Sequence, residues 1–293
     1  MLKTETPSLQ HTELDLYATA DLVNAFIDDQ QQAVQAARAA SGQIAAAVDA
    51  AVGRIAAGGR LIYAGAGTSG RLGVLDSVEL YPTFSWPKER AIGLLAGGRG
   101  AMFEAVEGAE DSREQGAADI NALNAGPNDV VLCIAASGST PYVLGAIEAA
   151  RKTGALTIGL ANNVDAPVAA QAELGITLDT GAEVISGSTR LKAGTAQKIV
   201  LNTFSSALMV RLNKVYGNLM VDLKATNAKL IRRTVNLTML ACGVDEASAR
   251  SALQECDFHV KAAIIMLRKK VNAATAQSLL AATNGSVRAA LEK

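Results

Sequence analysis

The chain has 293 residues, with 27 basic and 28 acidic side chains, two histidines and three cysteines. This length is enough for one large or two ordinary domains with a substantial core. The formal net charge of −1 offers no general attraction for nucleic acid or an anionic membrane, so neither is expected as a partner. A multi-histidine metal site or a Ser-His-Asp triad would have to use His11 or His259, and we expect no metal and no cofactor.

The first fifty-odd residues are predicted to be helical. Apolar side chains recur there at spacings of four and three, and Gly58-Gly59 follows as a stop signal. The first 22 residues carry charges throughout and lack the apolar centre of a signal peptide. The three cysteines show no CxxC spacing, so we expect reduced thiols in a cytoplasmic protein.

Five short apolar runs, rich in strand-forming residues, follow between Arg60 and Leu178. They are Arg60–Ala64, Ala91–Leu95, Asp129–Ala135, Ala155–Leu160 and Leu174–Leu178. Helical stretches separate most of them, for example Thr140–Lys152. Nearly continuous apolar strands that alternate with helices predict an α/β fold, in which helices cover both faces of a parallel sheet.

The strand signals disappear after about Lys224, and the rest of the chain is predicted to be helical. Five apolar residues there fall on one helical face: Leu253, Cys256, Val260, Ile264 and Leu267. Ala273–Leu291 is predicted to add more helix. We therefore divide the chain into a main domain of residues 1–224, with an N-terminal helical arm, and a small helical domain of residues 225–293.

Three loops that follow predicted strands share one composition. Gly65–Arg71, Ala135–Tyr142 and Ser186–Thr195 are rich in glycine, serine and threonine. Glycines let backbone N–H groups approach an anion, hydroxyls add donors, and a following helix presents its positive end. Serine and threonine also cap helices without any ligand. However, three such loops at the ligand-binding edge of one sheet favour a functional site.

The first loop contains two misleading patterns. Gly65–Gly70 matches GxGxxG, but the next strand ends in Leu95-Ala96-Gly97-Gly98, without the acid that holds a dinucleotide ribose. Arg71-Leu72 replaces the Lys-Ser/Thr of a P-loop. The hydroxyl-rich loops therefore suit one small phosphate, such as that of a phosphosugar.

Because histidine is scarce, proton transfer is expected to fall to carboxylates or lysine. Seven acids lie near the loops: Asp76, Glu79, Glu104, Glu107, Glu110, Asp111 and Glu183. Their spacing alone selects no pair. If Gly70 to Glu79 were one straight helix, Glu79 would lie roughly 13 Å beyond the loop. Either that helix ends early, as Pro82 permits, or Glu79 serves a site shared with a neighbouring subunit.

Five longer strings resemble the N-acetylmuramic acid 6-phosphate etherase family. They are residues 61–73 (LIYAGAGTSGRLG), 105–112 (AVEGAEDS), 135–142 (AASGSTPY), 181–198 (GAEVISGSTRLKAGTAQK) and 217–222 (GNLMVD). The resemblance implies a SIS-type (sugar isomerase) three-layer αβα sandwich with a five-stranded parallel sheet. It also implies a homodimer with shared active sites, and a three-helix C-terminal domain like a ubiquitin-associated domain.

The implied activity is that of a lyase. It removes the D-lactyl ether from C3 of N-acetylmuramic acid 6-phosphate, giving N-acetylglucosamine 6-phosphate and D-lactate during peptidoglycan recycling in the cytoplasm. Carried over to this sequence, Glu110 is the base at C2 and Glu79 is the acid that protonates the leaving lactate. This elimination and the following hydration need no metal or cofactor.

The resemblance also implies a set of substrate-binding residues. Ser69, Ser137, Ser139 and Thr140 are expected to hold the phosphate. Ser186, Ser188, Thr189 and Lys192 are expected around the sugar. Gly67, Thr68 and Glu183 complete the expected substrate-binding set.

Two alternative functions remain open at this point. A sugar-phosphate sensor would bind without turnover, as does the animal glucokinase regulatory protein, which resembles this family but is a much longer chain with two such domains. An aldose–ketose isomerase on the same fold would interconvert hexose 6-phosphates. A DNA-binding regulator is not expected, because no helix-turn-helix precedes the sheet and the charge is balanced.

Overall fold

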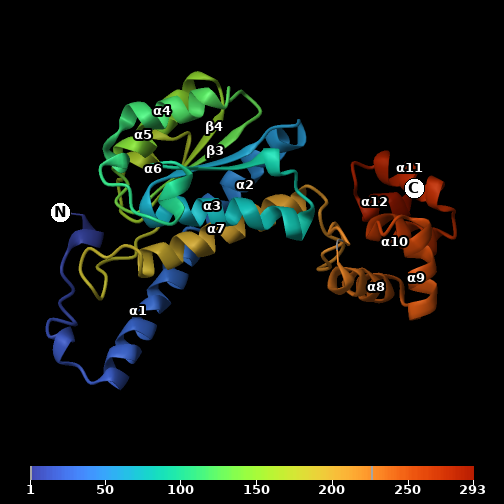
Figure 1. The fold of residues 1–293 in the computed structure, drawn as a ribbon, viewed down its shortest axis with the longest axis horizontal. Coiled ribbons are helices and arrows are strands. Elements are labelled where there is room, and N and C mark those ends of the chain that lie inside the picture. Colours follow the sequence, from blue (N-terminus) through green and yellow to red (C-terminus); the bar gives the residue numbers. More distant parts are fainter. Residues whose placement is uncertain (1, 226) are drawn as a thin grey trace. The chain divides into compact units, whose positions relative to one another are not determined.

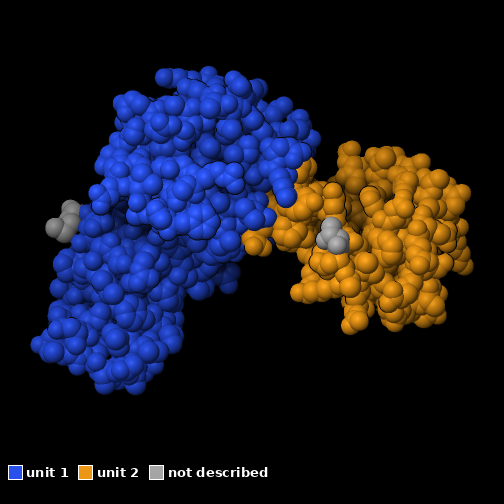
Figure 2. All heavy atoms as spheres, viewed as in Figure 1, with its two compact units in different colours: residues 1–78, 88–206 blue, residues 79–87, 207–293 orange. Residues whose placement is uncertain are grey.

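A computed structural model describes residues 2–225 and 227–293. The chain forms two compact units (Figure 2). The first comprises the chain up to Val78 together with Lys88–Ser206, and the second comprises Glu79–Pro87 together with Ala207–Lys293. Each unit has its own core, and each is described by itself below.

A five-stranded parallel sheet forms the centre of the first unit. Its strands are β1 (Leu61–Gly65), β2 (Ala91–Leu95), β3 (Val130–Ala135), β4 (Leu156–Ala161) and β5 (Leu174–Thr177). Their order across the sheet is β2-β1-β3-β4-β5, and every neighbouring pair is parallel. All residues of β1, β3 and β4 are buried, as expected for central strands covered on both faces. The predicted α/β class and all five strands are confirmed.

Helices cover both faces of this sheet, so the predicted three-layer arrangement is confirmed (Figure 1). One face carries α4 (Arg113–Ala122), α5 (Pro141–Lys152) and α6 (Pro167–Gln171). The other carries α2 (Ser41–Ala56), α3 (Gly67–Phe84) and α7 (Lys192–Arg211). The N-terminal helix α1 (Thr19–Ala39) precedes α2. Five 3-10 helices complete the first two hundred residues: Lys3–Glu5, Leu14–Leu16, Lys88–Arg90, Arg99–Met102 and Ala109–Asp111.

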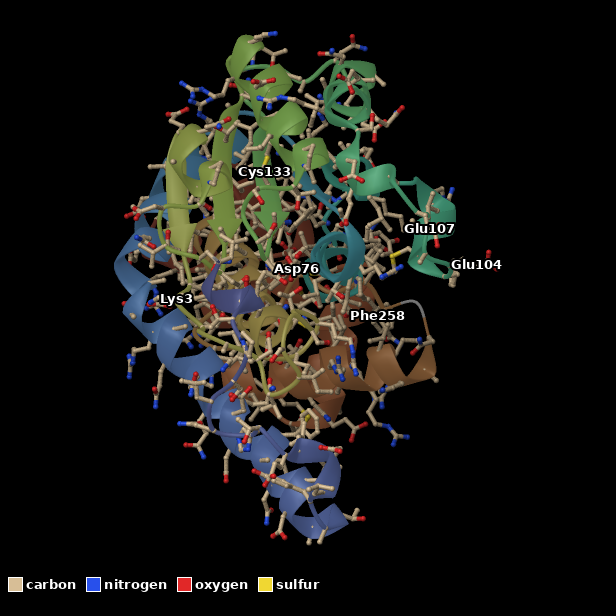
Figure 3. The ribbon with its side chains drawn as sticks, turned by 90° about the vertical axis from the view of Figure 1, so that its left-hand side faces the viewer. Lys3, Asp76, Glu104, Glu107, Cys133 and Phe258 are labelled. Carbon is tan, nitrogen blue, oxygen red and sulfur yellow. The ribbon has the colours of Figure 1, made fainter. Side chains whose placement is uncertain are left out.

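A buried carboxylate connects the central sheet with two of the helices that cover it. Asp76 of α3, which is 1% exposed, accepts a hydrogen bond of 2.7 Å from the Tyr63 hydroxyl of β1. Its other oxygen accepts bonds from Asn202 Nδ2 at 2.9 Å and Ser205 Oγ at 3.3 Å, both on α7. Burial, together with the charge and hydrogen bond of Asp76, raises the pKa of Tyr63 well above its usual range. Asp76, which is labelled in Figure 3, therefore fixes α3 and α7 against the sheet.

Two glycines allow the sharp turn from β1 into α3. A Cβ on Gly70 would lie 2.5 Å from the carbonyl oxygen of Gly65 and from a methyl group of Leu95. A Cβ on Gly65 would lie 2.7 Å from the Cα of Gly70. Such contacts are too short for any larger residue, so glycine at both positions lets α3 begin directly at the carboxyl edge of the sheet.

The second unit is helical, as predicted, but it contains more helices than expected. Its residues after 227 form five helices rather than three: α8 (Ala228–Cys242), α9 (Glu246–Glu255), α10 (Val260–Lys269), α11 (Ala273–Ala281) and α12 (Val287–Glu292). The predicted boundary after residue 224 falls inside this unit, because Val221 and Leu223 belong to its hydrophobic core. In the described part of the chain, no helix combines the length and the hydropathy that a membrane span requires.

One predicted helical face is divided between two helices. Helix α9 ends at Glu255, and Asp257 and Phe258 adopt left-handed conformations with φ of 50° and 58° before α10 begins. Leu253 and Cys256 nevertheless reach the same core as the apolar residues of α10. The apolar spacing therefore identified the buried residues correctly but missed the turn between them.

We predict that Asp76→Ala lowers the free energy of unfolding by about 3 kcal/mol or more, because each buried donor left without a partner costs about 1–3 kcal/mol. Tyr63→Phe removes only one of the three donors and should cost about 1 kcal/mol. Urea unfolding of the two variants and the parent protein measures both values. Equal losses for the two variants would contradict a central role for the Asp76 carboxylate.

Candidate active site

The strand order places two of the three predicted loops side by side. From β1 the chain passes to β2 on one side, whereas β3, β4 and β5 lie on the other. In such sheets, ligands bind in the crevice outside the carboxyl ends of the strands where the direction of winding reverses. The loops that follow β1 and β3 meet at this point, and a cavity of about 360 Å³ lies between them.

Hydroxyl groups and carboxylates line this cavity, which we call the central cavity. The hydroxyl residues are Thr68, Ser69, Ser137, Ser139, Thr140 and Thr189. The acids are Glu5, Glu110 and Asp111. Ala66, Gly67, Ala135, Ala136 and Pro141 contribute the remaining wall. The structure thus brings together eight residues that the sequence analysis assigned to the site, namely Glu110, Gly67, Thr68, Ser69, Ser137, Ser139, Thr140 and Thr189.

Two helices begin at the central cavity. Helix α3 begins at Gly67, and α5 begins at Pro141 with Thr140 as its N-cap residue. The first N–H groups of a helix have no intrahelical partner and lie at the positive end of its dipole. The Thr140 side chain makes no capping hydrogen bond, which leaves its hydroxyl available to a ligand. This arrangement suits an anion such as a phosphate.

The loop after β3 is held in a shape that requires glycine. Gly138 has a φ of 77°, and a Cβ there would lie 2.2 Å from that of Ala166. The Ser137 hydroxyl accepts a hydrogen bond of 3.3 Å from the Ser139 N–H. The close packing behind Gly138 turns the Ser137 and Ser139 side chains toward the cavity that both of them line.

The two predicted catalytic acids occupy different parts of the fold. Glu110 lies in the 3-10 helix Ala109–Asp111, after Gly108 in a left-handed conformation, and it is exposed on the wall of the central cavity. Glu79 is exposed on the part of α3 that belongs to the second unit. Helix α3 does not end early but continues to Phe84, with Pro82 inside it. The explanation that α3 ends early is therefore wrong, and the shared site stays a prediction.

The third loop is organised by a buried ion pair. Lys192 is 1% exposed, and its ammonium group donates to Asp29 at 2.7 Å, to Gln32 at 2.9 Å and to the carbonyl oxygen of Ala182 at 2.6 Å. These three bonds use all three of its donors. The second carboxylate oxygen of Asp29 is buried without a hydrogen bond. Lys192 therefore connects α1 with the loop before α7 and has no donor left for a ligand in this conformation.

Glu183 caps the N-terminus of α7. Its two carboxylate oxygens accept the N–H groups of Lys192 at 3.0 Å and Ala193 at 2.9 Å, which are the first N–H groups of the helix. Burial raises the pKa of Glu183, although these bonds and the Lys192 charge oppose the shift. Glu183 thus uses both oxygens within the protein. The substrate-binding roles assigned to Glu183 and Lys192 stay predictions, and their contacts favour a positioning role.

The other residues of the third loop are placed differently. Thr189 lines the central cavity. The Ser186 hydroxyl accepts a hydrogen bond of 3.3 Å from the N–H of Ser8, in the N-terminal segment. The Ser188 N–H donates to the carbonyl oxygen of Ile185 within the loop. The roles assigned to Ser186 and Ser188 therefore also stay predictions.

The N-terminal segment contributes to the site through contacts that the sequence did not predict. Thr4 is fully buried and exchanges two hydrogen bonds with the Asn163 side chain, which also donates to the carbonyl oxygens of Ala136 and Ser137. Asn163 therefore fastens the segment to the loop after β3, and Glu5 is placed on the cavity wall. No local pattern signals this contact, because 159 residues separate Thr4 from Asn163.

Comparison with known proteins defines the class of this fold and site. Residues 43–151 match the model of the glucokinase regulatory protein N-terminal SIS domain, and residues 106–207 match the SIS domain model. A phosphoheptose isomerase from Francisella tularensis has a similar fold, with a TM-score of 0.50 and 20% identity over 66% of this chain and 98% of that chain. The first unit is therefore a SIS domain.

Full-length relatives identify the family within this class. The N-acetylmuramic acid 6-phosphate etherase of Deinococcus radiodurans is 55% identical over 289 residues, covering 99% of this chain and 95% of that protein. The enzyme of the same name from Salmonella dublin is 48% identical over 291 residues, covering 99% of this chain and 98% of that protein. The chain belongs to the N-acetylmuramic acid 6-phosphate etherase family, which confirms the resemblance found in the sequence.

We predict that Lys192→Met lowers the free energy of unfolding by about 3–5 kcal/mol, because it leaves the Asp29 carboxylate buried and unpaired. The double variant Lys192→Met/Asp29→Leu removes both charges and should regain much of this loss. Denaturant unfolding measures the stability, and steady-state kinetics measures KM for the sugar phosphate. A double variant no more stable than Lys192→Met would contradict the role of the unpaired Asp29 charge. A KM equal to that of the parent in a stable double variant would contradict both a binding and a positioning role for Lys192.

Proposed function

We propose that this protein is a lyase that cleaves the D-lactyl ether of N-acetylmuramic acid 6-phosphate, giving N-acetylglucosamine 6-phosphate and D-lactate. The observation that carries the proposal is the placement of Glu110 on the wall of a cavity built from hydroxyl groups and two helix N-termini. Membership of the etherase family supports the choice of substrate and reaction.

The phosphate of the substrate is proposed to bind in the central cavity. Ser69, Ser137, Ser139 and Thr140 would donate hydroxyl hydrogen bonds, while Gly67 and Thr68 present the start of α3. Two helix dipoles stabilise the negative charge there without any lysine or arginine among the lining residues. The open-chain sugar would then extend past Thr189 toward Glu110.

The reaction is proposed to proceed by elimination and hydration. The C1 aldehyde of the open-chain sugar acidifies the C2 proton, which the Glu110 carboxylate removes. The electron pair forms the C2–C3 double bond as the C3–oxygen bond breaks, and Glu79 donates a proton to the departing lactate. Water then adds at C3, and a proton returns to C2. The net reaction consumes one water and needs no redox step.

Glu79 is proposed to act in a site shared between two subunits of a homodimer. In the continuous helix α3, Glu79 lies about 13 Å along the helix axis from Gly70, the residue after Ser69 of the central cavity. A second copy is also suggested by α1, where Val23, Ile27 and Val34 are 49%, 61% and 59% exposed along one helical face. Figure 1 shows the N-terminal part of this helix extending away from the sheet.

We also propose that the protein works in the cytoplasm, where the recycled sugar phosphate would arise. Cys133, Cys242 and Cys256 are free thiols, which suits a reducing compartment. Burial raises the pKa of Cys133 far above the usual range of a thiol. This thiol therefore stays protonated and serves as a small apolar group in the core.

We expect the purified protein to release D-lactate from N-acetylmuramic acid 6-phosphate, with solvent deuterium incorporated at C2 of the product. Glu110→Gln should lower kcat by about 10²–10⁴-fold, because it removes the base without changing the size of the side chain. Glu104→Gln is the matched control, since Glu104, like Glu110, is an exposed acid in the segment of residues 101–110 (Figure 3). Interconversion of hexose 6-phosphates, or sugar binding without lactate release, would contradict the proposal.

The shared site predicts complementation between two inactive variants. Glu79→Gln and Glu110→Gln subunits should each form inactive homodimers. A mixed dimer would contain one site with both native glutamates and should therefore regain about half of the parent activity. Co-expression with two different affinity tags isolates the mixed dimer for the D-lactate assay. If Glu79 acts within its own subunit, every site lacks one glutamate and no activity returns.

A further inference from the structure

A second cavity, which we call the side cavity, adjoins the central cavity. It has a volume of about 250 Å³ and lies between the end of β2 and the segment of residues 101–110. Ala66, Gly67 and Glu110 line both cavities. Glu110, the residue proposed to remove the C2 proton, thus lies at the junction of the central cavity and the side cavity. A substituent on a carbon next to C2 could therefore enter the side cavity.

The walls of the side cavity are formed mostly by small apolar residues. They include Ala96, Ala101, Ala105, Val106 and Ala109. The wall is closed by tight packing at Gly97, where φ is 85° and a Cβ would lie 2.8 Å from the Cβ of Val106. Alanine and glycine at these positions leave room for a group of a few heavy atoms with an apolar part.

One cation lines the side cavity. Arg71 is half-buried on the first turns of α3, and its Nε donates a hydrogen bond of 2.9 Å to the carbonyl oxygen of Ala101. Within residues 2–225 and 227–293, its two terminal nitrogens make no hydrogen bond or ion pair with another protein group. The guanidinium is therefore held in place by one nitrogen while its outer edge is available. This edge matches the two oxygens of a carboxylate.

We propose that the side cavity binds the lactyl group of the substrate, with the Arg71 terminal nitrogens on the lactyl carboxylate and the alanine wall around the lactyl methyl. This inference rests on the proposed function. The lactyl group is attached at C3, next to the carbon that Glu110 deprotonates, and it carries the only carboxylate of the substrate. An uncharged N-acetyl group would leave the Arg71 charge without a partner.

The acids of the same cavity do not neutralise Arg71. Glu107 lines the side cavity, but its side chain is exposed to solvent in the segment of residues 101–110 (Figure 3). Solvent and salt therefore screen its charge. Glu110 is exposed as well and is engaged at C2 in the proposed reaction. A bound lactyl carboxylate would accept hydrogen bonds directly from the terminal nitrogens of Arg71. Arg71 would therefore be a determinant of substrate specificity.

The test compares ligands that differ only in the lactyl group. Calorimetric titration of the full-length protein measures the binding of N-acetylglucosamine 6-phosphate, which lacks it, and inhibition kinetics gives the constant for D-lactate. We expect Arg71→Gln to raise KM for N-acetylmuramic acid 6-phosphate and the inhibition constant of D-lactate by about tenfold or more. The affinity for N-acetylglucosamine 6-phosphate should change less than about twofold. Arg99→Gln, on the same rim but outside both cavities, is the matched control.

A second variant tests the same proposal independently, in case Arg71→Gln does not fold. Ala105→Leu fills the side cavity from an exposed position and should also weaken only the ligands that carry the lactyl group. Equal losses for all three ligands, or no loss for any of them, would overturn the proposal. If the parent protein binds the sugar but releases no lactate, the proposed function fails. In that case, titration with N-acetylmuramic acid 6-phosphate, with and without Arg71→Gln, still decides the role of Arg71.

Discussion

The buried carboxylate of Asp76 is the interaction on which the geometry of the first unit depends. It joins β1, α3 and α7 through bonds from Tyr63, Asn202 and Ser205. Removing a charged group from water is costly unless its oxygens are fully hydrogen-bonded, and these three donors meet that requirement. Helices α3 and α7 both begin at the functional edge of the sheet, so the same contact fixes where two of the three loops lie.

The site combines glycine-containing loops with a rigid support. Gly65, Gly70 and Gly138 occupy positions where a side chain would collide with neighbouring atoms. The loops can therefore pass close to a ligand, while the sheet and Asp76 keep them in place. The proposed anion binding relies on hydroxyls and helix N-termini, so such a site leaves no mark on the net charge of −1. The scarcity of histidine is explained in the same way, because the proposed proton transfers belong to glutamates.

Local sequence patterns predicted most of the fold. The five apolar runs became the five strands, since a strand buried on both faces needs a continuous apolar sequence. The helical C-terminal region was also found, but the turn at Asp257 and Phe258 was not. Neither residue is a glycine or proline, so nothing in the sequence signals their left-handed conformations. The boundary after residue 224 was misplaced because Val221 and Leu223 pack into the second core without helical periodicity of their own.

The sequence by itself determined the α/β class, the hydroxyl-rich character of the loops and the family of the protein. These features depend on local composition or on long strings of characteristic residues. Only the tertiary structure decided which residues share a cavity. It joined Glu5 to the site through Asn163, turned Lys192 inward onto Asp29, and placed Arg71 beside Glu110 at a second cavity. Each of these relations joins segments that are distant in sequence, and the packing of the folded chain sets their distances.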